Sequence, residues 1–110
     1  MHRWDVVFIR ADESDVVGHP AVLLSSEDIL ADPKQHRINA VVGTKKQLGE
    51  SPRSHHVILE EADGLQHLTL VDCSLIYMLR KTSILRPAGS VTVYRRQEIQ
   101  RKIRACLGLG

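Results

Sequence analysis

The sequence predicts a mainly β domain that ends in one helix. Short β-branched and apolar segments alternate with polar turns over residues 4–87, which is typical of an antiparallel sheet. From Val93 onward the apolar residues recur with the period of a helix. The length of 110 residues suffices for one core. We therefore expect a single domain, 1–110, built as a small antiparallel barrel or curled sheet and packed by a C-terminal helix.

The first half of the chain predicts three strands. Residues 4–10 are rich in β-branched and aromatic side chains, and a polar turn follows at 11–15. Gly18 permits a sharp turn and Pro20 fixes φ where the second strand, 20–25, begins. Residues 26–36 are interpreted as a loop, with a short helical turn possible after Ser26 as a cap. The third strand is expected at 37–43.

The second half predicts a polar, mobile loop at 45–54 and a fourth strand at 55–60. After a turn at 61–64, the mostly apolar run 68–79 predicts one long central strand, and 81–87 a short edge segment. A final helix would place its apolar face at the end of the chain and stop at Gly108. The residues of that face are Ile99, Ile103, Cys106 and Leu107.

Composition excludes several classes of protein. No apolar stretch approaches the roughly 18 residues of a membrane span, and Asp5 and Arg10 interrupt any signal-peptide core. We expect a cytoplasmic protein. Its two cysteines, Cys73 and Cys106, form no metal motif and are interpreted as buried apolar thiols.

Charge is unevenly distributed along the chain. Residues 1–75 hold seven Lys or Arg against twelve Asp or Glu, whereas residues 76–110 hold eight against one, Glu98. Such a basic segment either faces phosphates or forms a solvated helix surface.

Several short sequence motifs, taken in order along the chain, resemble those of the MazF/PemK-type toxins. Gly18–Ser25 is similar to the family's Arg-Pro-Ala-Val-Val-Leu-Ser signature, with His19 in the position of the arginine. Val41–Thr44 ends the third strand where the family keeps Thr or Ser. The opening strand Trp4–Ile9, the region Leu70–Lys81 and the segment Gly89–Val91 also match in order. The chain is identified as a divergent member.

This resemblance implies a small SH3-like, curled antiparallel barrel, shared with a gyrase-poisoning toxin family. It implies a homodimer that cleaves single-stranded RNA without a metal or another cofactor, as the toxin of a type II toxin–antitoxin pair. The partner would be an acidic antitoxin protein. The family's two central catalytic positions carry over to His19 and Thr44. The alternative hypothesis is a catalytically inactive module of the same fold, which binds a partner protein or nucleic acid without cleavage.

The residue types fit this chemistry. Histidine exchanges protons near neutral pH, so His19 suits a general acid or base, and the Thr44 hydroxyl suits a donor to phosphate. Phosphate contacts are expected from five basic residues: Lys45, Lys46, Arg80, Lys81 and Arg86. The adjacent His55 and His56 would point to opposite faces of a strand. No metal site is expected.

Overall fold

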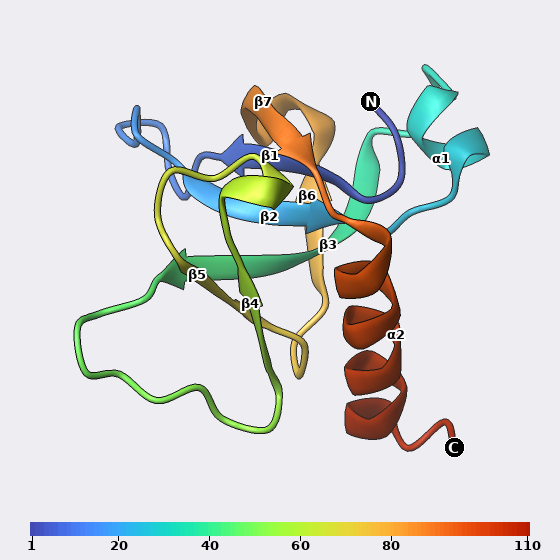
Figure 1. The fold of residues 1–110 in the computed structure, drawn as a ribbon. Helices are drawn as coiled ribbons and strands as arrows, with labels where there is room; N and C mark the ends of the chain where they lie inside the picture. Colours follow the sequence, from blue (N-terminus) through green and yellow to red (C-terminus); the bar gives the residue numbers. More distant parts are fainter.

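The computed structural model describes residues 1–110 and shows one seven-stranded antiparallel sheet with a long helix at its side (Figure 1). Strand order is β4-β5-β3-β2-β1-β7, and β6 also pairs with β3. The expected mainly β fold is confirmed. The sheet curls but stays open, because no pairing joins the end strands β4 and β7. The strands are β1 (Asp5–Ile9), β2 (His19–Leu23), β3 (Arg37–Lys45), β4 (His56–Leu59), β5 (Thr69–Asp72), β6 (Tyr77–Arg80) and β7 (Ile84–Ser90); the helices are α1 (Glu27–Ala31) and α2 (Val93–Leu107).

Both faces of the sheet centre are buried. Side chains alternate across a strand, so neighbouring residues such as Val6 and Val7 enter different cores. The first core lies on the side of α2, whose Ile99 is fully buried, and the second lies on the side of α1, which contributes Leu30. Burial on both faces explains the nearly continuous apolar runs of the central strands.

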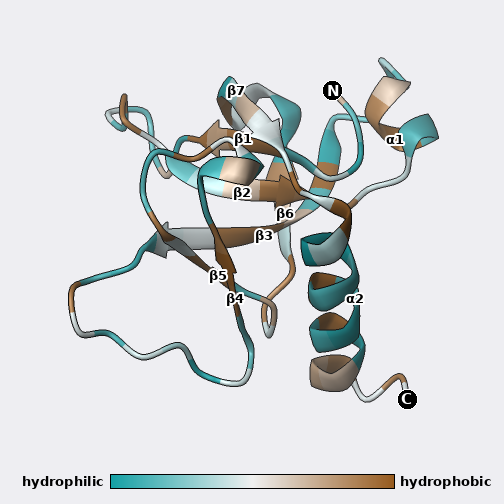
Figure 2. Ribbon diagram, in the orientation of Figure 1, coloured by the Kyte–Doolittle hydropathy of each residue, from teal (hydrophilic) through white to brown (hydrophobic).

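Helix α2 confirms only part of the predicted apolar face. Ile99 is buried and Ile103 packs against the core, while most of the helix surface is hydrophilic (Figure 2). The expectation that Cys106 is a buried thiol is wrong, because it is exposed. The helix contacts the sheet mainly at β4, and its last turn carries no buried residue.

The long strand expected at 68–79 is interrupted. Along one edge of β3, β5 pairs with the end of the strand (Gly43 opposite Val71) and β6 with its beginning (Ala40 opposite Tyr77). Five residues of the β5–β6 segment therefore stand opposite two residues of β3. A turn absorbs the three additional residues, and the Asp72 carboxylate stabilises it by accepting hydrogen bonds from the Ser74 amide and hydroxyl at 2.9 and 2.5 Å.

Short helical turns follow Ser26 and begin at Lys81. The helical turn after Ser26 is confirmed as α1, and the Ser26 hydroxyl accepts a hydrogen bond from the Ile29 amide at 3.4 Å. The segment 81–87 is a 3-10 turn, Lys81–Ser83, followed by β7, which is the end strand beside β1 and extends to Ser90. None of the helices has the length and apolar character needed to cross a membrane.

Candidate functional site

A cleft of about 770 Å³ opens where the start of β2, the end of β3 and the middle of β7 face the segment 64–69. No Asp or Glu lines it. Its charged and polar lining comes from residues far apart in the sequence: His19, Thr44, Lys45, Gln47, Gln66, His67, Thr69 and Arg86. The cleft therefore carries positive charge without a carboxylate.

His19 is placed at the rim of the cleft by the backbone before it. Gly18 has φ +82°, and a Cβ there would lie 2.9 Å from Leu85 Cδ1, so this position needs glycine. His19 pairs with Ile9 of β1 at the first position of β2. On the other side, β2 pairs with β3 through Ala21 and Val42, and two further steps of that register bring His19 level with Thr44. The structure thus brings together the two residues singled out by the sequence.

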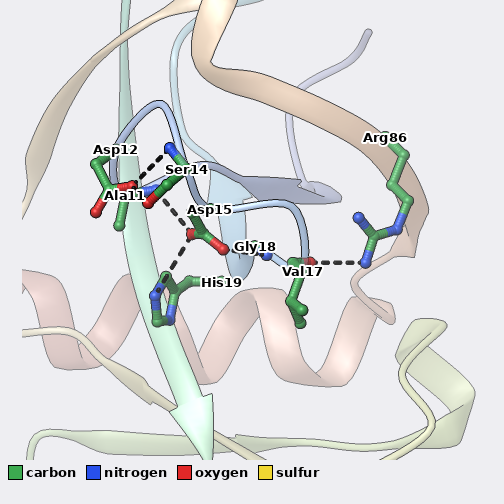
Figure 3. A network of polar contacts seen from close by, with 8 residues as sticks. All are labelled: Ala11, Asp12, Ser14, Asp15, Val17, Gly18, His19 and Arg86. Carbon is green, nitrogen blue, oxygen red and sulfur yellow. Dashed lines mark hydrogen bonds and ion pairs between the residues drawn. The ribbon is translucent and has the colours of Figure 1, made fainter.

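Asp15 holds both the loop before β2 and the His19 ring (Figure 3). Its carboxylate accepts hydrogen bonds from the Ala11 amide at 2.9 Å and the Gly18 amide at 2.8 Å. His19 Nε2 lies 3.8 Å from Asp15 Oδ2. The two amide hydrogen bonds, with a smaller contribution from His19, hold the pKa of Asp15 below its usual range. Asp15 is therefore ionised near neutral pH and stabilises the His19 ring whenever the ring takes up a proton.

Arg86 provides a permanent charge across the cleft from His19. It stands opposite Phe8 in the β1–β7 pairing, and its guanidinium lies 4.4 Å from the centre of the Phe8 ring. Arg86 Nη2 also donates a hydrogen bond to the Val17 carbonyl at 2.8 Å (Figure 3). A guanidinium has five N–H donors, so donors remain for a ligand.

Comparison with solved structures finds this fold over the full length of the chain. An endoribonuclease from a mycobacterial species, in complex with its cognate antitoxin, matches with a TM-score of 0.80 at 19% identity and covers 100% of this chain and 97% of its own. The Mycobacterium tuberculosis toxin MazF-mt6 matches with a TM-score of 0.78 at 14% identity, over 96% and 98%. A chain of the MazE–MazF complex from Deinococcus radiodurans matches with a TM-score of 0.71 at 16% identity, over 100% and 98%. The chain has the MazF fold.

At these identities the likeness is one of fold. No family model and no curated protein matches the sequence. What this MazF-fold chain can do chemically therefore depends on its own residues.

The basic residues expected to contact phosphate do not form one group. Lys45 lines the cleft with Arg86, and Lys46 follows at the end of β3. Arg80 pairs with Arg37 at the opposite end of β3, roughly 20 Å from Thr44 along the strand, in a separate basic hollow. The Lys81 ammonium donates hydrogen bonds to the Ile29 and Asp32 carbonyls at the end of α1. The structure thus separates Arg80 and Lys81 from Arg86.

The remaining histidines divide into one inside the MazF-fold cleft and four outside it. His67 lines the cleft, and sequence reasoning missed it because nothing around it in the sequence marks it. His55 and His56 do not face opposite ways as expected. His55 lies in the turn before β4, and the two ring centres are 4.4 Å apart. No group of three or more His, Cys, Asp or Glu is placed to hold a metal ion.

Proposed function

We propose that this protein is a metal-independent endoribonuclease that cleaves single-stranded RNA as the toxin of a type II toxin–antitoxin pair. The observation that carries the proposal is the cleft, where His19 and Thr44 lie beside the charges of Lys45 and Arg86 with no carboxylate in the lining. Such a surface attracts a polyanion. Mg²⁺ prefers carboxylate and other oxygen ligands, which this lining offers poorly, so the proposal uses side chains alone.

Each residue of the cleft has a task in this reaction. His19 takes the proton of a ribose 2′-hydroxyl, and ionised Asp15, 3.8 Å away, stabilises the imidazolium that forms. The Thr44 hydroxyl donates a hydrogen bond to the phosphoryl oxygens as their charge grows. Arg86 supplies the permanent charge that His19 lacks, and Lys45 adds a second one.

Other basic residues would guide RNA beyond the cleft. Lys46 continues the path from Lys45, and Arg80 offers a second basic hollow together with Lys34 and Arg37. Lys81 would contribute through its charge only, because its ammonium is already bound to two carbonyls.

The proposal includes a homodimer. Four consecutive large apolar residues, 75–78, are exposed in the turn before β6 and on β6 itself, and β6 is paired on one side only. An exposed apolar strand edge of this kind is typical of a protein interface. Light scattering should give the mass of two chains for the native protein, and Met78→Glu should shift it toward one chain. A native mass of one chain at tens of micromolar would count against the dimer.

The proposal also includes an acidic antitoxin in the cytoplasm, and α2 is the surface that would attract it. Three of its five basic residues already have partners inside the chain. Arg95 pairs with Glu98 at 3.1 Å, Arg96 donates to the Val91 carbonyl, and Lys102 donates to the His56 carbonyl. Arg101 and Arg104 are exposed and would meet the acidic segment.

The test is cleavage of a long unstructured RNA in EDTA, with the cut ends mapped. We expect cleavage by the native protein and a loss of about 10²–10⁴-fold in rate for His19→Ala. For Thr44→Ala we expect a loss of about 10²-fold. His2→Ala is the matched control, because this exposed histidine lies outside both the cleft and the basic hollow beside Arg80. Folded native protein that binds RNA and cuts none of a broad set would favour the non-catalytic module instead.

A further inference from the structure

We propose that His67 is the general acid of the cleft, which protonates the departing 5′-oxygen while His19 accepts the proton of the attacking 2′-hydroxyl. This inference rests on the proposed ribonuclease function and adds a catalytic residue from a different part of the chain. The cleft is lined by two histidines, one on β2 and the other just before β5.

The reaction needs two proton-transfer groups in different places. The 2′-oxygen forms a bond to phosphorus as the bond from phosphorus to the 5′-oxygen breaks, which leaves a 2′,3′-cyclic phosphate and a 5′-hydroxyl. One proton leaves the 2′-oxygen and one arrives at the 5′-oxygen, so the step balances without any co-reactant. Attacking and leaving oxygens stand roughly in line on opposite sides of phosphorus. A single imidazole beside one of them cannot reach the other in the same step.

Of the other groups that line the cleft, none suits the second task. Arg86 cannot release a proton in proteins, and a lysine ammonium such as that of Lys45 releases one poorly near neutral pH. The Thr44 hydroxyl is a far weaker acid than imidazolium and is engaged as a donor to phosphate. Histidine is the side chain that gives and takes protons at this pH, and His67 is the second histidine present.

His67 is held in position by its neighbours in sequence. Leu65, two residues before it, is buried in the core, and Thr69, two residues after it, is buried at the start of β5. The Thr69 hydroxyl donates a hydrogen bond back to the His67 carbonyl at 3.1 Å. The His67 side chain does not pack in the core, because the residue is exposed. The two buried residues therefore fix the position of the His67 backbone, and the exposed ring remains accessible to a ligand.

The same segment is pressed against β7 next to Arg86. At Gly64, where φ is +93°, an added Cβ would lie 2.6 Å from the Ala88 carbonyl oxygen. At Gly89 it would lie 2.7 Å from the Asp63 carbonyl oxygen. Two glycines thus let the backbone before His67 touch the backbone that follows Arg86. This contact holds the His67 side of the cleft against the strand that carries the phosphate-binding charge.

A substrate with sulfur in place of the 5′-oxygen at the cut site tests the role of His67. A thiolate leaves without being protonated, so the need for a general acid disappears. In EDTA we expect His67→Ala to cut ordinary RNA about 10²–10⁴-fold more slowly than the native protein. On the sulfur substrate the same variant should stay within about tenfold of the native rate. His19→Ala should be slow on both substrates, and His2→Ala, at an exposed histidine outside the cleft and the basic hollow, should match the native protein on both.

The outcomes separate this inference from the function on which it rests. If the native protein cuts RNA and His67→Ala cuts it equally fast, the inference is overturned and the function stands. If His67→Ala is slowed to the same degree on both substrates, His67 is not the acid. If the native protein cuts neither substrate, the proposed function fails. Thermal unfolding of each variant shows that it is folded, and we expect no loss for His67→Ala because the residue is exposed.

Discussion

Replacement of Asp63 by alanine should destabilise the fold far more than an ordinary loss of a carboxylate. Asp63 is 1% exposed and ends the 3-10 turn Glu61–Asp63. Its carboxylate accepts a hydrogen bond from the Glu60 amide at 3.0 Å and another from the Thr92 amide, just before α2, at 3.0 Å. It therefore joins the turn that precedes the cleft segment to the start of the long helix.

The expected magnitude follows from these two contacts. A hydrogen bond to a charged group contributes about 1.5 kcal/mol at the lower end of its range, so the loss of both costs about 3 kcal/mol. Unfolding entropy of about 2.1 cal/mol/K per residue gives roughly 0.23 kcal/mol/K for a chain of this size. Asp63→Ala should therefore lower the melting temperature by roughly 13 °C. Asp63→Asn keeps one acceptor and should lose about half as much.

Urea and thermal unfolding followed by circular dichroism measure both variants. Glu13→Ala is the control, since Glu13 is an exposed loop residue and its removal should change stability by less than about 0.5 kcal/mol. If Asp63→Ala unfolds within about 0.5 kcal/mol of the native protein, the carboxylate does not join the turn to the helix as described.

Three further results are expected. Arg86→Gln should weaken RNA binding and reduce the slope of log affinity against log salt by about one, whereas Arg10→Gln should leave the slope unchanged. Burial opposes ionisation of Asp72, but hydrogen bonds from Ser74 prevail and lower its pKa from 3.8. The ionised Asp72 carboxylate therefore stabilises the fold above the unfolded pKa of 3.8, and this contribution is lost as pH falls through the lower pKa of the folded state. Asp72→Asn should flatten the acid limb of a stability–pH curve. Burial raises the pKa of Cys73 to about 12, so a thiol reagent at pH 8 should label exposed Cys106 alone in the folded protein, and rapid labelling of both thiols would refute that burial.

Sequence patterns predicted the elements whose evidence is local. The β-branched segments, the cap at Ser26 and the helix from Val93 each carry their signal within a few residues. The break between β5 and β6 has no such signal, because Leu75 to Met78 are apolar whether they continue a strand or stand in a turn. Pairing with β3 decides it, and pairing is a property of distant segments.

The candidate site was predictable where it lies beside a strand that the sequence marks. His19 and Thr44 flank two such strands, and they do line one cleft. Arg86 reaches the cleft through the pairing of β7 with β1, in which it stands opposite Phe8, and the segment that carries His67 reaches it through the contact between Gly64 and Gly89. Arg80 and Lys81 were expected to contact phosphate together with Arg86, because the three residues are close in sequence. They are separated because β6 and β7 pair with different strands.

The loop 11–18 has a mechanical consequence for the cleft. Asp15 binds His19 from one side of this loop, and the Val17 carbonyl binds Arg86 from the other. A single movement of the loop away from the cleft breaks both contacts at once, so the His19 ring and the Arg86 guanidinium become more mobile together. In relaxation-dispersion NMR the side chains of His19 and Arg86 should therefore share a single exchange rate. A ligand that binds either side chain should reduce the motion of both.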